Sequence, residues 1–498
     1  MFNEELMLST SERGEASAQQ IEDLAKALLA PGSSDDLYNT SGGSLTNQSL
    51  EGMLTDLTFN ETDFTFWHDV NKMRAFSTVE EYSQQIGLGI NTGGFVGQLE
   101  NPEFRDPDFR KQVAIVKFMS EGWTVGDVAE ATNTIVDERT RSQRSAMNRL
   151  LRNVNRAFYT GNSSWISKSF DGLAPTIAAS STDQITDLRG ANLSMNTFNL
   201  IGQLITEGNG HAENAKIYVS PAGVQNLSKI IEAGAASTGD RKIAEMGNDG
   251  ITIGGKISGI MTNYGMMMPR MDKVLGLEFE SKTVPQYYNG TTWVESATSD
   301  KAPSIPTVST ANNASTTGSL FSAGTTRPSG AVYRYRVVAR NTYGQSIAST
   351  VATPSAVVAG GSVTLTITPN PADSGSKTPE CFEIYSEKVA ASGTYRYLTT
   401  VAADGTNPLA AVTYVDKNDY IPGTARMYIV DQTSQGEQRV MAFSQLLPIH
   451  NTDLAKTGRF TQGLINLYGV PKYYKPNVLV EIRNIGVEQT SGNLFNTV

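Results

Sequence analysis

The clearest hydrophobic pattern in this 498-residue sequence lies between Arg139 and Asn162. Apolar residues recur there with the spacing of one side of an α-helix. These residues are Met147, Leu150, Leu151, Val154, Ala157 and Phe158. Gly161 and Asn162 then supply residue types that commonly end helices. The pattern predicts a long amphipathic helix that buries its apolar side.

The N-terminal stretch 1–60 contains a shorter helical pattern followed by loop-like sequence. Ile21, Leu24 and Leu28 are spaced as on one side of a helix, and Pro31-Gly32 ends the run. The residues that follow are mostly Ser, Thr, Gly, Asn and Asp, with too few apolar residues for a core. We therefore predict an N-terminal arm whose short helix packs on another subunit or domain.

Residues 61–130 are predicted to form an extended loop and its flanking strands. The runs TVEEYSQQI (78–86) and FRKQVAIVKFMSEGWTVG (109–126) are strand-like, whereas the glycines of GLGINTGGFVG (87–97) disfavour a strand. This glycine-rich run is close to a phosphate-binding G-x-G-x-x-G fingerprint, but Thr92 stands where the third glycine is needed. We interpret it as a long loop between two strands.

The middle of the chain alternates helices and strands. Residues 131–195 hold the long helix, and residues 196–300 follow an α/β pattern. Ser194 is placed to cap one helix and Ser220-Pro221 to open another, with the strand KIYV (216–219) between them. These signals predict a compact α/β domain.

Residues 301–424 are predicted to form an inserted β-sandwich. Six strand-like runs there are separated by turn residues. They are AVYRYRVVAR, SIASTVAT, SVTLTIT, CFEIYSEK, TYRYLTTV and AVTYVD. The remainder, 425–498, returns to strand-rich sequence. The predicted fold class is therefore α+β with an inserted all-β sandwich.

Composition excludes several kinds of functional site. The single cysteine, Cys381, cannot form a disulfide framework or a Cys-based metal site, and the three histidines are far apart in sequence. The sequence contains no P-loop, H-E-x-x-H or G-x-S-x-G motif. We expect no catalytic, metal-binding or cofactor-binding residues and no enzyme activity. Cys381 is expected to be buried in a sandwich strand, and His68, which follows Phe66-Trp67, to be packed or at an interface.

The sequence gives no sign of a membrane partner. It lacks a run of about 18 apolar residues, and its N-terminus lacks the basic flank and apolar run of a signal peptide. We therefore expect the protein to be made in a cytoplasm.

Charge is distributed unevenly along the chain. Residues 1–70 contain thirteen Asp and Glu against Arg13 and Lys26, whereas the net charge of the whole chain is −10. The predicted long helix carries six arginines with no acid between them: Arg139, Arg141, Arg144, Arg149, Arg152 and Arg156. Three interpretations are open: an intersubunit contact with the acidic arm, a solvated face with local ion pairs, or direct contact with nucleic acid. The first makes these arginines, with Ile21, Leu24 and Leu28, candidate intersubunit contacts.

The order of these segments resembles the major capsid proteins of tailed double-stranded DNA bacteriophages, the Hong Kong ninety-seven type of fold. FRKQVAIVKFM (109–119) resembles the return strand of that family's extended loop, and RSAMNRLLRNVNRAFYTGN (144–162) is similar to its spine helix. AKIYVSPAGVQNLSKII (215–231) resembles the central strand and helix of its axial domain. Asp187-Leu188-Arg189-Gly190 and Ile482-Arg483-Asn484 extend the match. The run YRYRVVARNTYGQSIAS in the sandwich is similar to fibronectin type III or immunoglobulin-like modules.

The resemblance implies a division of the chain and a function. It implies an N-terminal arm (1–60), an extended loop (61–130), a peripheral domain with the spine helix (131–195), an axial domain (196–300), an inserted immunoglobulin-like sandwich (301–424) and a return to the peripheral and axial core (425–498). The implied function is self-assembly into the icosahedral capsid that encloses phage DNA, with the sandwich on the outside for inter-capsomer stabilisation or surface binding.

The implied partners are other copies of the chain, in the hexamers and pentamers of a closed shell. Portal, scaffold or decoration proteins are expected as well, and packaged double-stranded DNA only non-specifically. The expected location is the virion, after assembly in the host cytoplasm. Two alternatives stay open: an encapsulin-like nanocompartment subunit, and an enzyme that carries an immunoglobulin-like binding module.

Overall fold

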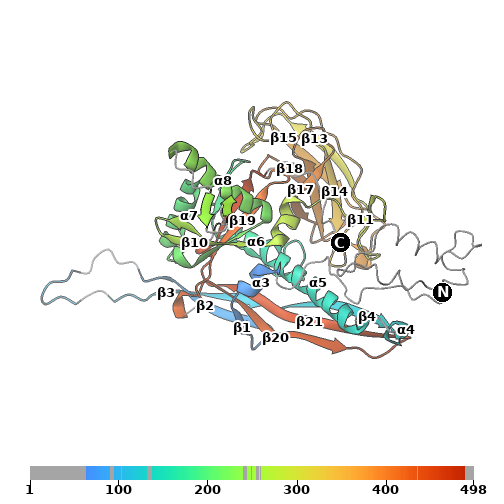
Figure 1. The fold of residues 1–498 in the computed structure, drawn as a ribbon, viewed down its shortest axis with the longest axis horizontal. Coiled ribbons are helices and arrows are strands. Elements are labelled where there is room, and N and C mark those ends of the chain that lie inside the picture. Colours follow the sequence, from blue (N-terminus) through green and yellow to red (C-terminus); the bar gives the residue numbers. More distant parts are fainter. Residues whose placement is uncertain are drawn as a thin grey trace, which may run out of the picture. The chain divides into compact units, whose positions relative to one another are not determined.

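In the computed structural model, residues 63–89, 95–101, 104–131, 137–238, 244–247, 250–253, 257, 259–434 and 436–487 are described. They form a mixture of helices and mostly antiparallel strands, which confirms the predicted α+β class (Figure 1). The predicted arm, including Ile21, Leu24 and Leu28, lies outside the described residues.

The long helix predicted from its apolar spacing is α5 (Glu138–Thr160), which we call the spine helix. It buries Leu150, Leu151, Val154 and Phe158 as predicted, while Met147 is only partly buried. The spine helix lies along a four-stranded sheet (Figure 1). The strand order is β1 (Lys72–Arg74), β20 (Met441–Asp453), β21 (Phe460–Tyr473) and β4 (Lys117–Gly126).

A six-stranded sheet forms the second layer of the core. Its order is β5 (Ile185–Asp187), β22 (Val480–Ile485), β19 (Ala425–Asp431), β6 (Ala215–Val219), β10 (Gly265–Met271) and β9 (Ile260–Thr262). Helices α6 (Leu173–Ser180), α7 (Met195–Glu207) and α8 (Pro221–Thr238) accompany it. The central strand β6 pairs with β19, which lies more than 200 residues further along the chain.

Both predicted helix starts are confirmed. The Ser194 hydroxyl accepts a hydrogen bond from the Thr197 N–H at 3.3 Å, and the Ser220 hydroxyl accepts one from the Gly223 N–H at 3.0 Å. These side chains satisfy N–H groups that have no partner within the first turn of a helix.

Aromatic rings join the two layers. Phe66, in the short helix α3 (Thr65–Asp69), has its ring centroid 5.0 Å from that of Phe158 on the spine helix and 4.7 Å from that of Tyr218 on β6. Beside them, the buried carboxylate of Asp272 accepts hydrogen bonds from Asn155 and Tyr159, each at 2.8 Å. The spine helix is therefore fixed to both sheets by packing and by a buried hydrogen-bond centre.

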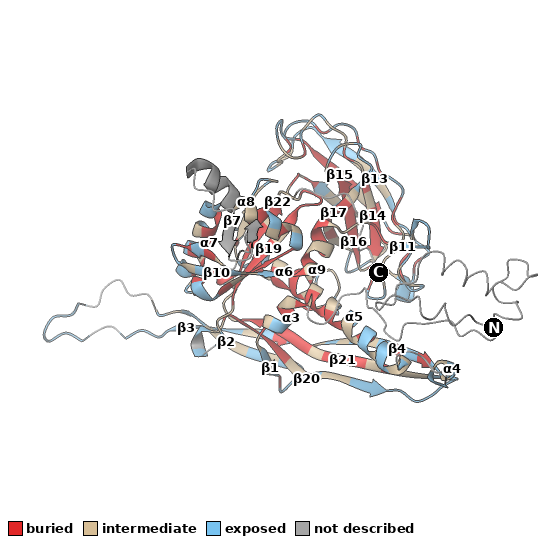
Figure 2. Cartoon of the chain, in the orientation of Figure 1, coloured by how far each residue is buried: buried red, intermediate tan, exposed pale blue. Residues whose placement is uncertain are grey.

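The predicted extended loop begins and ends in a two-stranded hairpin of β2 (Val79–Gly87) and β3 (Asp108–Ile115). The strands are antiparallel, with Val79 opposite Ile115 and Gly87 opposite Asp108. The predicted strand pair is thus confirmed, although the run 109–126 divides at Val116 into β3 and β4, which belong to different sheets. The described part of the loop between the strands is exposed (Figure 2).

Residues 301–424 contain two three-stranded antiparallel sheets. One has the order β13 (Thr307–Asn313), β15 (Ser362–Thr368), β18 (Val412–Asp416), and the other β14 (Tyr335–Arg340), β16 (Cys381–Glu387), β17 (Tyr395–Ala402). Side chains of both sheets share one hydrophobic cluster, as a β-sandwich requires. That this sandwich is immunoglobulin-like stays a prediction.

Two details of the sandwich differ from the sequence prediction. SIASTVAT (346–353) does not form a regular strand. The backbone N–H groups of Ser346 and Ser349 donate hydrogen bonds to β14. Strand pairing is limited to two isolated bridges, one at Ala352 and one at Gln345, the residue before the run. In contrast, TVSTANN (307–313) forms β13, although its small polar residues carry little strand signal. Pairing with β15 along seven residues supplies what the local sequence does not.

The remaining short elements complete the described chain. They are α4 (Asp127–Ala131), α9 (Lys273–Leu275), the π-turn η5 (Gly276–Glu280), the hairpins β7 (Ala244–Gly247) with β8 (Gly250–Ile253) and β11 (Gln286–Tyr288) with β12 (Trp293–Glu295), and the 3-10 turns η3 (Thr182–Gln184), η4 (Ala212–Asn214), η6 (Gly375–Lys377), η7 (Gly436–Gln438) and η8 (Pro476–Val478).

Candidate assembly site and spine-helix junction

The hairpin of β2 and β3 has two chemically different faces. On one face, Glu80 accepts a hydrogen bond from Lys472 at 2.7 Å, and Gln84 donates to the Tyr474 carbonyl at 2.7 Å. Tyr82, between them on the same face, packs its ring against Tyr474. Alternation along the strands therefore turns this face toward the end of β21. Glu80 is largely shielded from solvent, because it is held by Lys472.

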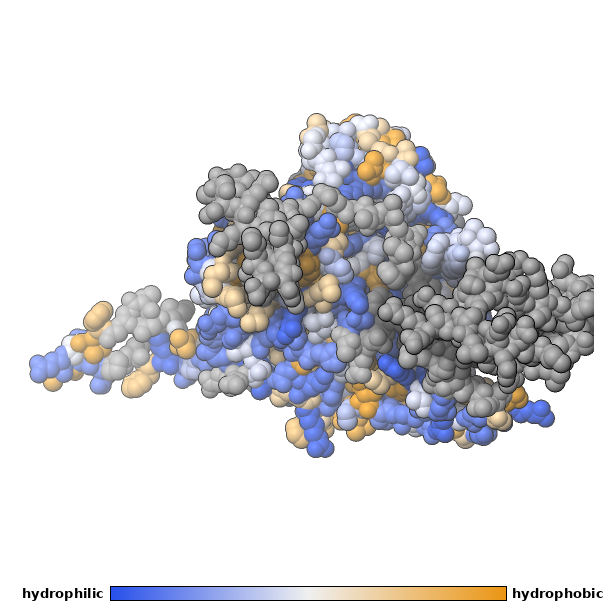
Figure 3. Space-filling view, in the orientation of Figure 1, coloured by the Kyte–Doolittle hydropathy of each residue, from blue (hydrophilic) through white to orange (hydrophobic). Residues whose placement is uncertain are grey.

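The opposite face of the hairpin exposes apolar side chains on both sides of an ion pair between Glu81 and Lys111. Val79, Phe109, Val113 and Ile115 lie on it and are 46 to 68% exposed. Further along the loop, Phe95, Leu99 and Phe104 are more than 90% exposed. Figure 3 shows hydrophobic residues between hydrophilic ones on the surface of this loop. A two-stranded hairpin with such a face is only marginally stable in water without a partner surface.

The six arginines of the spine helix do not form an unpaired row. Carboxylates of the same chain contact four of them. The pairs are Arg139 with Asp453 (2.6 Å), Arg141 with Glu138 (3.4 Å), Arg149 with Glu121 (3.7 Å) and Arg156 with Glu278 (3.0 Å). These contacts favour local ion pairing among the three interpretations of the row. Arg144 is exposed and Arg152 partly buried, and an intersubunit contact of the row stays a prediction.

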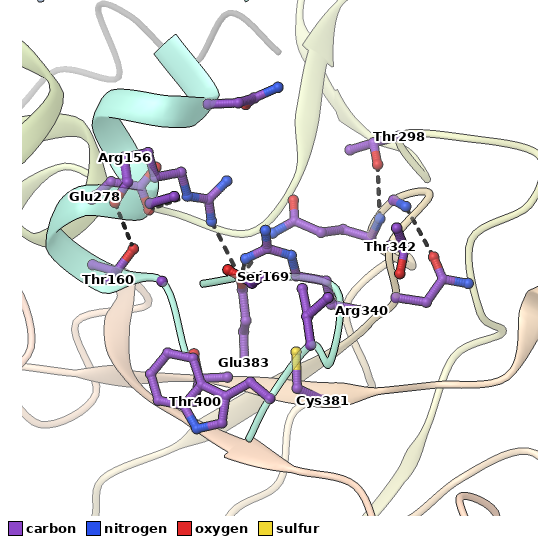
Figure 4. A pocket seen from close by; sticks show the side chains of 18 of the residues that line it. Arg156, Thr160, Ser169, Glu278, Thr298, Arg340, Thr342, Cys381, Glu383 and Thr400 are labelled. Atoms are coloured by element: carbon purple, nitrogen blue, oxygen red, sulfur yellow. Dashed lines mark hydrogen bonds and ion pairs between the residues drawn. The ribbon is translucent and has the colours of Figure 1, made fainter. Parts of the chain in front are cut away.

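The last turns of the spine helix meet the sandwich at a group of charges, which we call the junction. It consists of the buried carboxylates Glu278 and Glu383 and the partly buried cations Arg156, Lys282 and Arg340. Glu383 lies in β16 and its side chain is fully buried. One of its oxygens, Oε1, is 2.9 Å from Arg340, 3.1 Å from Lys282 and 3.7 Å from Arg156. In Figure 4, Arg156 reaches from the spine helix toward Glu383 on the sandwich.

The charges of the junction stabilise one another against the cost of burial. Burial by itself raises the pKa of Glu383, but Lys282, Arg340 and Arg156 outweigh it and hold that pKa far below its usual range. Burial lowers the pKa of Lys282, although Glu383 and Glu278 oppose the shift. The carboxylates are therefore ionised, and the sandwich is joined to the core by charges that depend on each other.

The junction lines a cavity of about 710 Å³ between β4, the spine helix, residues 277–286 and the sandwich. Polar side chains around it include Asn162, Ser169, Thr298 and Thr342. Cys381 also lines it, but burial raises the pKa of its thiol to about 12, so it is not a nucleophile at neutral pH. The expectation that Cys381 is buried in a sandwich strand is confirmed.

The sequence reasoning did not single out the junction residues other than Arg156. The sequence separations explain this, because Arg156, Lys282, Arg340 and Glu383 lie in four distant segments. The hairpin face could have been found, since Phe109, Val113 and Ile115 recur at every second or fourth position of a predicted strand.

The motifs 187–190 and 482–484 meet where the chain leaves the sandwich, through Asp187 and Asn484, which are 297 residues apart. The Asn484 amide donates to the Asp187 carboxylate and to the Asp419 carbonyl, each at 2.8 Å. Its oxygen accepts the Ile421 N–H at 2.9 Å, where the chain leaves the sandwich. Asn484 therefore holds the return point of the sandwich to the six-stranded sheet.

The histidines do not form a site with each other. His68 is exposed, because only Phe66 and Trp67 of its helix turn toward the core. The expectation that it is packed is therefore wrong, and the alternative that it lies at an interface stays a prediction. His211 contacts Gln438, and His450 contacts the Pro448 carbonyl. Within the described ranges, no group of three His, Cys, Asp or Glu side chains could hold a metal ion. No helix in those ranges is both long and apolar enough to span a membrane.

The sequence relatives found for this chain are major capsid proteins of phages. No family model matches the chain. A putative major capsid protein of Enterococcus phage phiEF24C is 24% identical over 468 residues, which cover 92% of this chain and 93% of the relative. The major capsid protein of Staphylococcus phage K is 22% identical over 456 residues, 89% of this chain and 90% of the relative.

Solved structures show more distant likeness. The capsid of the native GTA particle has a TM-score of 0.44 and 6% identity, and covers 90% of this chain and 98% of its own. The SrpI encapsulin of Synechococcus elongatus PCC 7942 has a TM-score of 0.39 and 7% identity, with 90% and 96% covered. The sequence relatives align along nearly their whole length, so this chain is similar to phage major capsid proteins over about nine-tenths of its residues.

Proposed function

We propose that this protein is the structural subunit of a phage capsid, of which many copies form a closed shell. The observation that carries the proposal is the homology to phage major capsid proteins over about nine-tenths of the chain. The curated sequence relatives are phage proteins, which favours a capsid over the encapsulin-like alternative.

The geometry supports assembly through the hairpin of β2 and β3. Its exposed face of Val79, Phe109, Val113 and Ile115 needs a partner surface, because apolar area in water costs about 25 cal/mol per Å². In a shell of identical subunits, each copy offers the same face to a neighbour, so one pattern of contact is repeated throughout. The hairpin therefore acts as a contact between copies.

The finer expectations belong to this proposal. The copies are arranged as hexamers and pentamers, the shell encloses double-stranded DNA, and the protein resides in the virion after assembly in the host cytoplasm. The sandwich faces outward, in keeping with its nine Lys and Arg against seven Asp and Glu over residues 301–424, which give DNA no strongly basic surface. Portal, scaffold and decoration proteins complete the expected partners.

Electron microscopy of the purified full-length chain tests the proposal. In negative stain, we expect closed particles of uniform diameter, formed by the chain alone or together with a scaffold protein. Monomers under every assembly condition would contradict the proposal. Robust hydrolytic activity that a single substitution abolishes would favour the enzyme alternative instead.

A further inference from the structure

The junction cavity carries more positive than negative charge. Six cationic side chains and three carboxylates line it. The cations are Arg149, Arg152, Arg156, Lys168, Lys282 and Arg340, and the carboxylates are Glu121, Glu278 and Glu383. Part of this excess of positive charge lies at the junction itself, because its three cations, Arg156, Lys282 and Arg340, share the two carboxylates Glu278 and Glu383.

The sharing is visible in the distances. Glu278 lies 3.0 Å from Arg156 and 3.5 Å from Lys282, and Glu383 contacts these same two cations as well as Arg340. Arg152 is one helical turn before Arg156 on the same side of the spine helix and also lines the cavity. Burial lowers the pKa of Arg152, Glu278 opposes this shift, and Arg156 adds to it. Like charges are thus held close together at a partly buried surface, which is costly unless an anion balances them.

We propose that the junction cavity binds a small oxyanion of the phosphate class, which balances the excess charge and bridges the spine helix to the sandwich. Arginine guanidinium groups suit this chemistry, because their planar N–H donors match two phosphate oxygens at once. Hydroxyl groups of Thr160, Ser169 and Thr342 line the same space, but each already donates a hydrogen bond within the chain. The cationic side chains are therefore the donors that this lining offers to the anion. A volume of about 710 Å³ is large enough for one or two phosphate groups with their bridging water.

The location gives the anion a structural consequence. Arg152 and Arg156 come from the spine helix, Lys282 from the segment after η5, and Arg340 from the sandwich. An anion among them contacts both sides of the junction and resists their separation. The inference does not depend on the proposed shell function, because all of its residues lie in one chain.

Binding of inorganic phosphate and pyrophosphate to the dissociated full-length subunit tests the proposal. We expect a saturable rise in Tm with either anion, at constant ionic strength against chloride, and a matching binding isotherm by calorimetry. Arg152→Gln should raise the apparent Kd for phosphate roughly tenfold or more, as expected for the loss of a charge-assisted contact. Lys168→Gln removes an exposed cation of the cavity lining without changing the junction. It should raise the Kd for phosphate roughly threefold to tenfold.

Arg141→Gln is the matched control, because Arg141 lies on the same helix, pairs with Glu138 and does not line the cavity. Its Kd for phosphate should equal that of the wild type. If Arg152→Gln does not fold, Lys168→Gln alone decides. The proposal is wrong if phosphate raises Tm no more than chloride does, or if Lys168→Gln and Arg141→Gln bind phosphate equally well. Binding by dissociated subunits but not by particles would mean that a neighbouring subunit fills the cavity, and would also overturn it.

Discussion

The hairpin of β2 and β3 and the sandwich of residues 301–424 are both antiparallel β structures, but they treat their apolar residues in opposite ways. In the sandwich, Tyr335, Leu365 and Ile384 come from both sheets and are completely buried against each other. In the hairpin, Phe109 and Val113 are more than half exposed. One structure completes its core within the chain, whereas the other leaves apolar side chains for a partner.

The two structures also differ in how they are joined to the core. The hairpin is held on one face by Glu80 and Gln84, which bond to the end of β21. The sandwich is held by the buried charges of the junction and by Asn484. Under the proposed function, the hairpin is the part whose stability depends on assembly, and the sandwich is the part whose position depends on contacts within the chain.

Charges introduced on the exposed hairpin face should have the largest effect on assembly. The double change Val113→Asp with Ile115→Asp should abolish particle formation, because two carboxylates would be buried at an apolar contact between subunits. The isolated subunit should stay folded, since surface substitutions usually change stability by about 0.5 kcal/mol or less. Sedimentation and circular dichroism measure the two properties.

Ser83→Asp is the matched control for this double change. Ser83 lies on the same face of the hairpin, opposite Lys111, and is already polar. It should leave particle yield nearly unchanged. Normal particles from the Val113→Asp, Ile115→Asp chain would show that this face is not an assembly contact.

Removal of the central carboxylate of the junction should have the next largest effect. Glu383→Gln leaves Lys282, Arg340 and Arg156 without their shared anion and should cost about 3 to 5 kcal/mol of unfolding free energy. Glu81→Gln is the control, because the Glu81–Lys111 pair is about half exposed and should contribute at most about 1 kcal/mol. Equal losses in urea unfolding of the two variants would contradict the role given to Glu383.

Sequence reasoning predicted helices and strands better than it predicted contacts between distant segments of the chain. The spacing of Leu150, Val154 and Phe158 identified the spine helix, and Ser194 and Ser220 identified two helix starts, because these signals are local. The strand β13 and the junction were not predicted. Apart from the Glu278–Lys282 pair, their stability comes from partners more than 40 residues away, and such pairing has no local signature.

Glu280 should contribute to the pH dependence of the unfolding free energy, with an effect smaller than that of Glu383→Gln. Burial raises the pKa of Glu280 to about 7, and the hydrogen bond from Ser220 opposes the shift. The folded chain therefore binds this proton more tightly than the unfolded chain, whose pKa is about 4.5. The contribution to stability is complete below pH 4.5, falls as pH rises toward 7, and is then constant.

Glu280→Gln removes this dependence. The variant should gain stability relative to the wild type between pH 5 and pH 8, at about 1.4 kcal/mol for each unit of pKa difference. Urea unfolding at these two pH values measures the gain. A difference between variant and wild type that is the same at both pH values would show that Glu280 does not titrate in this range.

The smallest effect is expected at the exposed arginines of the spine helix. If the acidic arm contacts them between subunits, Arg144→Glu should weaken assembly by about 0.2 to 1 kcal/mol per contact, and more so at low salt. Deletion of residues 1–32 should then make Arg144→Glu neutral, because the partner is gone. Assembly that is equally efficient at low and high salt in all variants would leave local ion pairing as the role of the row.

The central claim, that a neighbouring subunit covers the hairpin face, can be measured with one introduced thiol. The native Cys381 is buried and its thiol is protonated at neutral pH, so it gives little background labelling by maleimide. In a Val113→Cys chain, the new thiol should react quickly in dissociated subunits and at least tenfold more slowly in assembled particles. Equal labelling rates in the two states would contradict the claim.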